Sequence, residues 1–349
     1  MSILNISLYI KKYLQPGIKT TSVFFRFLFC FWMISCLLIN LQACSKVDQT
    51  SESFLVGIIN PNKGIFDISK GFIEGLTSQG YVEGKNIEYI KVLNTLDLDK
   101  ALEKMIASNV DLVFTVTTPA TKKAYSALKE KGIPVVFSLY DPVSGGVIKS
   151  LANPGENITG VQLRGSVSKA LDWFLRFSPE IKNIFVPVKY DSPATKLSLS
   201  DLQKAADIKG ITLFVHELSS SADIKKAFEA EAQNIDAVFM VHSIFISSHT
   251  EEIVREAMKY GLPVGGGTSS YTKGAMITYG VFAEEVGKQA SRMANLILQG
   301  TQAGEIPTET AEFYMGINME IAIKAGITIP SDILVHADDI IPYKKNGKQ

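Results

Sequence analysis

The feature that most constrains the fold is a regular alternation of short apolar runs with amphipathic segments, which begins at residue 54 of this 349-residue chain. The runs are rich in Val, Ile and Phe, and the segments between them carry apolar residues at helical spacing. Continuous apolar strands separated by such helices are typical of a parallel sheet covered by helices on both faces. The pattern predicts strands at 54–59, 86–93, 111–116, 134–139 and 158–163, with helices at 67–79, 97–108 and 119–131.

The alternation then repeats over residues 166–265. It predicts helices at 166–177, 193–209, 222–233 and 246–260, and strands at 183–188, 212–218, 237–242 and 262–265. A domain takes about 150 residues on average, so the chain is long enough for two. We therefore expect an α/β protein with two doubly wound parallel-sheet lobes, joined by a hinge and with a ligand cleft between them.

The first 43 residues differ from the rest of the chain. They carry four basic residues and no acidic residue, and they include a thirteen-residue apolar run at 27–39. A membrane-spanning helix needs about 20 apolar residues, so this shorter run fits the core of a signal peptide. The run leads to Leu41-Gln42-Ala43-Cys44, which is similar to a bacterial lipobox. We expect a signal peptide at 1–43, lipidation at Cys44 and a polar tether at 44–53. The alternative is an uncleaved signal anchor with a free Cys44.

Composition narrows the possible function classes. Basic and acidic residues number 35 each, and the part after residue 43 is mildly acidic because four of the basic residues precede it. This balance excludes a nucleic-acid binder held mainly by phosphate neutralisation and leaves small molecules as the expected partners. All three cysteines lie within the first 44 residues, so we expect neither disulfides nor thiolate metal sites in the remaining chain.

The sequence contains no recognisable catalytic constellation. Its four histidines include no pair at metal-ligand spacing, and the motifs G-x-S-x-G, G-x-x-x-x-G-K-[ST] and G-x-G-x-x-G are absent. Asp141 and Asp191 follow predicted strands, but neither has a spaced partner for acid–base chemistry. We therefore expect neither an enzyme nor a bound cofactor or metal.

Candidate ligand-binding residues gather where predicted strands end, which is where open α/β sheets bind ligands. Thr118-Pro119 and Ser192-Pro193 begin helices directly after such ends, and helix N-termini present free N–H groups to anions. The same residues are also good helix caps, so capping alone is the alternative interpretation.

Aromatic side chains lie beside these helix starts in the sequence. Aromatic rings, one carboxylate at Asp141 and helix N-terminal amides would together suit an amino-acid zwitterion. Asp141 could instead cap a helix beginning at Pro142, and His242 could equally be a structural histidine. The candidate ligand-binding residues are Asn60, Phe66, Thr117, Thr118, Tyr140, Asp141, Gln162, Tyr190, Ser192, His242, Ser243 and Tyr271.

Several segments carry a resemblance to a known family. They are Gly71-Phe72…Gly75-Leu76…Gly80-Tyr81-Val82-Glu83-Gly84-Lys85-Asn86-Ile87, Ile133-Pro134-Val135-Val136-Phe137, Asp141-Pro142-Val143, the run 150–161 (SLANPGENITGV), Gly287-Lys288-Gln289-Ala290 and Ala325-Gly326-Ile327-Thr328-Ile329-Pro330. Together they resemble the ABC-importer lipoproteins that include tryptophan- and tyrosine-binding members. The resemblance covers residues 54–341 and implies a type-I periplasmic-binding-protein fold that closes on a small ligand. It also implies delivery of that ligand to a permease driven by a separate ATPase.

One segment departs from the family pattern. Members that bind aromatic amino acids often carry a His-Pro…Leu-Asp pattern after the first strand, whereas here the segment reads Asn60-Pro61-Asn62-Lys63-Gly64-Ile65-Phe66-Asp67. The departure concerns the identity of the ligand and leaves the binding role intact. Asp141 matches the Asp-Pro-Val of the family, and residues 117–121 occupy its small-polar helix start.

The sequence as a whole predicts a solute-binding lipoprotein of an ABC importer. We expect an N-terminal lobe at 54–163 with about 283–300 crossing back, and a C-terminal lobe at 164–275 with about 310–341. The body is expected to be a monomer on the extracytoplasmic side of a bacterial membrane, with an amino acid or related compound, aromatic ones included, as its ligand. The alternatives are a lipid-anchored sensor that signals to a membrane partner and a two-lobed enzyme.

Overall fold

The computed structural model describes residues 53–61, 63–95 and 97–343. The expected signal peptide at 1–43, the expected lipidation site Cys44 and the tether up to residue 52 lie outside these residues. In the described part of the chain, none of the helices combines the length and the apolar character that crossing a bilayer requires.

Six strands form the sheet of the first lobe: β1 (Phe54–Asn60), β2 (Ile87–Leu93), β3 (Leu112–Val116), β4 (Val135–Leu139), β5 (Ile158–Gln162) and β11 (Glu309–Thr310). They follow the order β11-β5-β4-β3-β1-β2, and all neighbouring strands run parallel. Every residue of β3 and β4 is buried, as expected for apolar strands at the centre of a parallel sheet.

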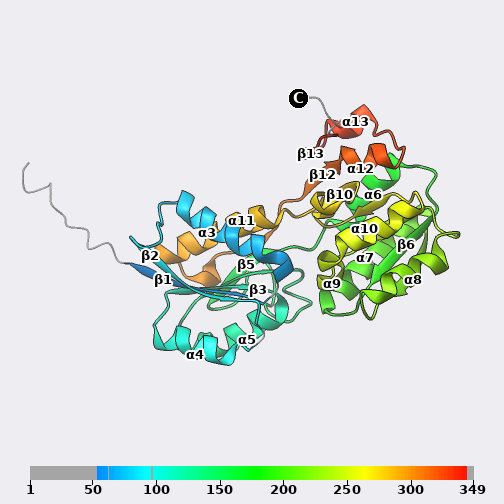
Figure 1. The fold of residues 1–349 in the computed structure, drawn as a ribbon. Coiled ribbons are helices and arrows are strands. Elements are labelled where there is room, and N and C mark those ends of the chain that lie inside the picture. The colour runs from blue at the N-terminus through cyan, green and yellow to red at the C-terminus, as the bar shows by residue number, and fades with distance from the viewer. Residues whose placement is uncertain (1–52, 62, 96, 344–349) are drawn as a thin grey trace, which may run out of the picture. The chain divides into compact units, whose positions relative to one another are not determined.

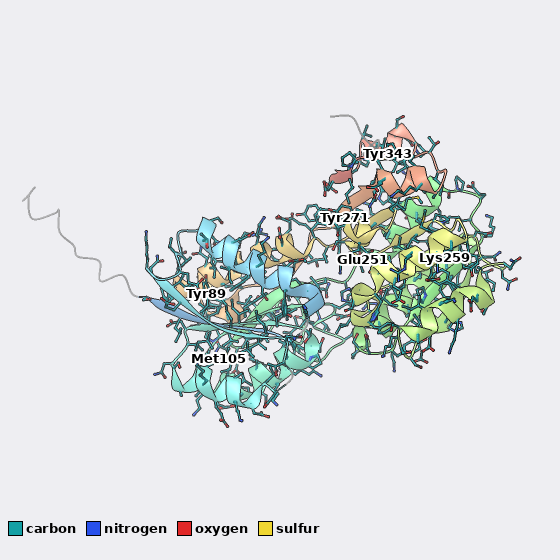
Figure 2. All side chains as sticks on the ribbon, in the orientation of Figure 1. Tyr89, Met105, Glu251, Lys259, Tyr271 and Tyr343 are labelled. Carbon is teal, nitrogen blue, oxygen red and sulfur yellow. The ribbon has the colours of Figure 1, made fainter. Side chains whose placement is uncertain are left out.

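Helices cover both faces of this sheet. Figure 1 shows α3 (Phe66–Ser78) and α11 (Ala283–Leu298) on one side, and α4 (Asp99–Ala107) and α5 (Thr118–Leu128) on the other. On the first side, Phe72 of α3 stacks on Phe114 of β3 with ring centroids 4.1 Å apart. On the second side, Met105 of α4 is fully buried (Figure 2). The short 3-10 helices of this lobe are η1 (Lys63–Ile65), η2 (Lys129–Lys131) and η4 (Ala303–Glu305).

The second lobe has seven strands: β6 (Asn183–Val188), β7 (Thr212–Glu217), β8 (Ala237–Met240), β9 (Val264–Gly266), β10 (Ile277–Gly280), β12 (Tyr314–Asn318) and β13 (Asp339–Ile341). Their order is β13-β12-β10-β9-β8-β6-β7, and only the β10–β12 pair of this sheet is antiparallel. Its helices are α6 (Val167–Phe177), α7 (Pro193–Lys209), α8 (Ala222–Glu231), α9 (Ile244–Ser248), α10 (Thr250–Lys259), α12 (Met319–Lys324), α13 (Ser331–Leu334) and the 3-10 helix η3 (Ser270–Lys273).

This sheet is also buried on both faces. Phe174 of α6 and Leu202 of α7 pack in one core cluster with Phe239 of β8. Phe228 of α8 and Ile253 of α10 pack in another with Val238, the neighbouring residue of the same strand. The prediction of two doubly wound, mostly parallel α/β lobes is therefore confirmed.

The chain passes between the two sheets at 163–166, 281–282 and 311–313. Between the second and third passages, α11 packs on α3 and β11 pairs with β5, so both elements belong to the first lobe. The strands β12 and β13 then join the sheet of the second lobe. Three peptide segments thus connect the lobes.

Glycines allow α11 to approach α3 closely. A Cβ added at Gly71 would overlap the backbone carbonyl of Glu284, and one at Gly287 would overlap the carbonyl oxygen of Ile68. At Gly75 the added atom would meet the hydroxyl of Ser291. At these positions there is no room for a Cβ atom, so the two helices meet through residues without side chains.

Most predicted elements differ from the observed ones by one or two residues at their ends, and the helix predicted at 246–260 is interrupted at His249. The segment forms two helices, with His249 at the C-cap position of α9 and at the N-cap position of α10, where its side chain forms no capping hydrogen bond. Around this break the Ser248 and Thr250 hydroxyls donate to the carbonyls of Ile244 and Ile246. Such bonds from hydroxyl side chains compete with regular backbone pairing and favour an interruption.

Candidate ligand-binding site

The carboxyl ends of β4 and β8, which belong to different lobes, carry two rings that meet. The ring of Tyr140 directly follows β4, and that of His242 follows β8 by one residue. Their centroids are 4.7 Å apart and their planes are inclined by 31°. Both residues were candidates from the sequence, and the structure brings them together.

The N-terminal half of α7 lies against the same place. Ala194 and Leu197 of this helix pack against the core cluster that contains Tyr140. The Ser198 hydroxyl, on the residue after Leu197, accepts a 3.0 Å hydrogen bond from the backbone N–H of His242. The helix thus contacts His242 directly and packs against the cluster that contains Tyr140.

Both rings are uncharged at neutral pH. Burial raises the pKa of Tyr140 to about 12, an effect that the nearby Ser198 hydroxyl partly offsets, and the buried phenol oxygen has no hydrogen-bond partner in the described chain. Burial also lowers the pKa of His242 to about 4, although the charge of Asp191 acts in the opposite direction. The pair is therefore neutral and largely apolar, and Tyr140 is nearly buried, with 5% of its surface exposed.

Asp141 follows Tyr140 and is nearly buried, with 6% of its surface exposed. Its Oδ1 accepts a 2.8 Å hydrogen bond from the backbone N–H of Ser144, and its Oδ2 accepts one of 2.5 Å from Nη1 of Arg164. Burial alone would raise the pKa of Asp141, but the bonds from Ser144 and Arg164 outweigh it and lower that pKa. Residues 142–146 form turns instead of the helix considered at Pro142, and Asp141 caps the first of them.

Arg164 completes an ion-pair network that sequence reasoning missed. Its Nε and Nη2 each donate a 2.8 Å hydrogen bond to the carboxylate of Asp201 in α7, in a bidentate pair. Hydrogen bonds to Asp201 and Asp141 raise the pKa of Arg164 above its already high value. Arg164 lies two residues after β5, at the kind of strand end where open α/β sheets bind ligands. This position in the sequence could have identified Arg164 as a candidate. Nothing local marks Asp201 as its partner, 37 residues away.

Two more candidates cap helices at the same edge of the second sheet. Ser192 caps α7 by accepting from the N–H of Thr195 at 3.3 Å, and Ser243 caps α9 by accepting from Ile246 at 3.4 Å. Asp191 accepts from the N–H of Phe245 at 2.9 Å, so it ties the loop after β6 to α9. Both hydroxyls therefore cap helices, which is the alternative interpretation that the sequence left open for Ser192.

Thr117 and Thr118 begin α5 at the end of β3. Thr117 has φ 80° and ψ 145°, a region that β-branched residues rarely enter, and its side chain forms no capping hydrogen bond. Its carbonyl accepts from the Thr121 hydroxyl at 2.8 Å. The backbone at this strand end is therefore strained, a condition that often accompanies functional positions.

The remaining candidates have different surroundings. Asn60 is fully buried, and its Nδ2 donates to the carbonyl of Ile65 and to the Ser69 hydroxyl, both at 3.0 Å. Phe66 is the first residue of α3, Gln162 is the last residue of β5, and Tyr190 is exposed in the loop after β6.

Tyr271 belongs to another aromatic group (Figure 2). Its hydroxyl donates to Asp339 at 2.6 Å and its ring stacks on Phe282 at 5.5 Å. Phe282 in turn stacks on Tyr314 at 4.8 Å, so these rings line the second and third passages between the lobes. The part of the chain that the structure describes has no group of three or more His, Cys, Asp or Glu side chains placed to hold a metal ion.

Residues 56–341 match the family model described as ABC transporter substrate binding protein. The chain belongs to this family. Proteins of the family bind small-molecule substrates for ABC transporters, which gives the ring pair and its surroundings a functional context.

Similar proteins agree with this assignment. A tyrosine-binding protein from Clostridioides difficile (strain R20291) is 27% identical over 284 residues, which cover 80% of each chain. The structure is also similar to an ABC domain in complex with L-Trp from Streptococcus pneumonia, with a TM-score of 0.74, 22% identity and coverage of 83% of this chain and 100% of that one. A conserved domain protein from Vibrio cholerae matches with a TM-score of 0.71, 27% identity and the same coverage. The type-I periplasmic-binding-protein fold that the sequence resemblance implied is confirmed.

As a substrate-binding protein, the chain offers a site of mixed chemistry at the ends of β4 and β8. The rings of Tyr140 and His242 supply apolar surface, and the Asp141 carboxylate supplies negative charge beside them. This combination can contact a planar or apolar group together with a cationic one.

Proposed function

We propose that this protein captures a free amino acid, with an aromatic one as the preferred class, where the carboxyl ends of β4 and β8 meet, and delivers it to an ABC permease. The observation that carries the proposal is the Tyr140–His242 ring pair, 4.7 Å apart, in a chain that is 27% identical to a tyrosine-binding protein. Both rings are neutral, so they favour apolar or aromatic side chains over charged ones.

The charge pattern beside the rings supports an amino-acid ligand. The carboxylate of Asp141 accepts one hydrogen bond from Ser144 and one from Arg164, and a carboxylate has about four lone-pair sites. An ammonium group therefore adds a partner to Asp141 without displacing the existing ones. Charge-assisted bonds of this kind contribute roughly 1.5–3 kcal/mol, enough to separate amino acids from sugars of similar size.

A thermal-shift panel on the full chain in detergent tests the proposal. The panel contains L-tyrosine, L-tryptophan, L-leucine, a purine nucleoside and a hexose. A ligand that binds only the folded state at 100 times its dissociation constant stabilises it by about 2.7 kcal/mol. We expect the aromatic amino acids to raise the melting temperature most. A response to the nucleoside or the hexose, with none to the amino acids, would reject the proposed ligand class.

We further propose that the protein is anchored through a lipidated Cys44 and serves import. Cells that lack the chain should then take up labelled L-tyrosine or L-tryptophan more slowly than cells that carry it. Uptake that does not change, in a protein that binds these amino acids in vitro, would favour a ligand sensor over an importer component.

A further inference from the structure

The Arg164 side chain joins three parts of the molecule. It lies in the segment that leaves β5 for α6, where its backbone N–H donates to the carbonyl of Tyr140 at 2.9 Å. Its guanidinium binds Asp141, which follows β4 in the first lobe, and Asp201, which lies in α7 of the second lobe. One residue therefore connects the loop after β4, the first passage between the lobes and a helix of the second lobe.

The bonds of Arg164 have the geometry of strong ion pairs. The contacts with Asp201 are bidentate at 2.8 Å each, and the contact with Asp141 is 2.5 Å. The side chains are mostly shielded from water, with 30% of Arg164, 24% of Asp201 and 5% of Asp141 exposed. Shielded, bidentate arginine–carboxylate pairs hold their partners in a defined orientation far better than exposed lysine pairs do.

Asp201 also lies on the face of α7 that contacts the ring pair. Ala194, Leu197, Ser198 and Asp201 are spaced by three and four residues, so they share one side of the helix. The first two pack with the core cluster of Tyr140, Ser198 binds the backbone of His242, and Asp201 binds Arg164. The ion pair therefore continues the same contact surface between α7 and the end of β4.

We propose that Arg164 is a positioning residue, which through Asp141 and Asp201 holds the loop after β4 against α7 and so fixes the placement of Tyr140 relative to His242. The inference rests on the proposed function only for its effect on binding. Loss of the ion pair between Arg164 and Asp201 leaves Asp141 paired with Arg164 and leaves the fold of each lobe intact. It allows the separation of the two lobes to change. Ligand affinity then falls because the two rings are less often placed to receive a ligand together.

Pulsed electron paramagnetic resonance on the full chain in detergent tests this inference without any ligand. Spin labels are attached to ketone-bearing amino acids introduced at Glu103 of α4 and Lys225 of α8, both exposed and in different lobes. The variants are Asp201→Asn and Arg164→Gln. The matched control is Asp207→Asn on the same helix, because Asp207 is exposed and its carboxylate accepts a hydrogen bond from Gln203, one turn earlier in the same helix.

We expect Asp201→Asn and Arg164→Gln to broaden the distance distribution between the labels, the double variant to add nothing further, and Asp207→Asn to leave the distribution unchanged. With L-tyrosine as the probe, we expect the affinity of Asp201→Asn to fall roughly two- to thirtyfold. If Arg164→Gln does not fold, Asp201→Asn alone decides. An unchanged distribution in Asp201→Asn, or an equal change in Asp207→Asn, overturns the inference. Absence of L-tyrosine binding in the wild type rejects the proposed ligand and leaves the distance result valid.

Discussion

At the scale of one residue, the burial of His242 makes the stability of the protein depend on pH. Its ring contacts Tyr140, and burial lowers the pKa of His242 to about 4. The unfolded chain binds this proton with the ordinary histidine pKa of about 6.5, so protonation favours the unfolded state. The contribution of His242 to the free energy of unfolding should therefore be complete above pH 6.5 and be lost as the pH falls toward 4.

We expect this loss to be on the order of 3 kcal/mol between pH 7 and pH 4, from the size of the pKa shift. Urea unfolding at a series of pH values measures it, with His242→Gln as the variant that cannot titrate. Carboxylates such as Asp141 titrate in both proteins, so the difference between the two curves isolates His242. If the free energy of unfolding changed with pH in the same way in the wild type and in His242→Gln, the loss could not be assigned to His242.

Thr117 offers a second prediction at this scale. Its φ of 80° strains a β-branched residue, and a strained residue of this kind costs about 1–3 kcal/mol. Glycine adopts this conformation freely but costs roughly 0.5–1 kcal/mol in the entropy of the unfolded chain. Thr117→Gly should therefore stabilise the fold by about 1 kcal/mol in thermal unfolding, whereas Thr118→Gly, inside α5, should destabilise it. A less stable Thr117→Gly would show that the side chain of Thr117 contributes more than its strain costs.

Residues next to predicted strand ends could be identified from the sequence, and their partners could not. Tyr140 and His242 were candidates because each follows an apolar run, and the rule for open sheets places such residues at one edge. Arg164 met the same criterion and was overlooked. Its partner Asp201 lies in the middle of a helix of the other lobe, where only the three-dimensional packing of α7 reveals a role. Tyr271 was also a candidate from the sequence, but its hydroxyl binds Asp339 on β13.

At the scale of elements, the close approach of α11 to α3 leads to a testable substitution. Alanine is better than glycine in a helix by about 1 kcal/mol. At Gly287, however, the new methyl group would overlap the backbone carbonyl of Ile68, which cannot move without shifting α3. Gly287→Ala should therefore destabilise the protein by about 1–3 kcal/mol, the usual cost of overpacking.

Thermal unfolding measures this effect, with Lys288→Ala as the matched control on the same helix. Lys288 is partly exposed and pairs with Glu285, so its substitution should change the stability by no more than about 0.5 kcal/mol. Stability that is unchanged or increased in Gly287→Ala would mean that the two helices can separate without cost.

The elements of the alternating pattern could be predicted from the sequence, because a strand buried on both faces appears there as a continuous run of apolar residues. The later elements were not assigned from the sequence. The strand β11 has two residues and β13 has three, which is too short for any periodicity to be read. The break between α9 and α10 depends on side-chain hydrogen bonds of Ser248 and Thr250, which an apolar pattern does not record.

At the scale of the whole molecule, the expected lipid anchor can be tested independently of the stability of the fold. All three cysteines lie in the first 44 residues, outside the part of the chain that forms the two lobes. Cys44→Ser should therefore leave thermal unfolding unchanged while abolishing acylation, so that the protein no longer partitions into detergent in a phase-separation assay. Cys36→Ser is the matched control and should still partition. Unchanged partitioning of Cys44→Ser would indicate an uncleaved signal anchor in place of a lipid.

The central claim is that an amino acid binds at the Tyr140–His242 ring pair. Titration calorimetry with L-tyrosine and L-tryptophan on the full chain in detergent tests it directly, with Tyr140→Leu and His242→Leu as variants. Tyr260→Leu serves as the control, because Tyr260 is an exposed aromatic residue at the end of α10. The account predicts saturable binding by the wild type and the control, and at least about tenfold weaker binding, equivalent to 1.4 kcal/mol, in each ring variant. No binding of either amino acid, or wild-type affinity in both ring variants, would contradict it.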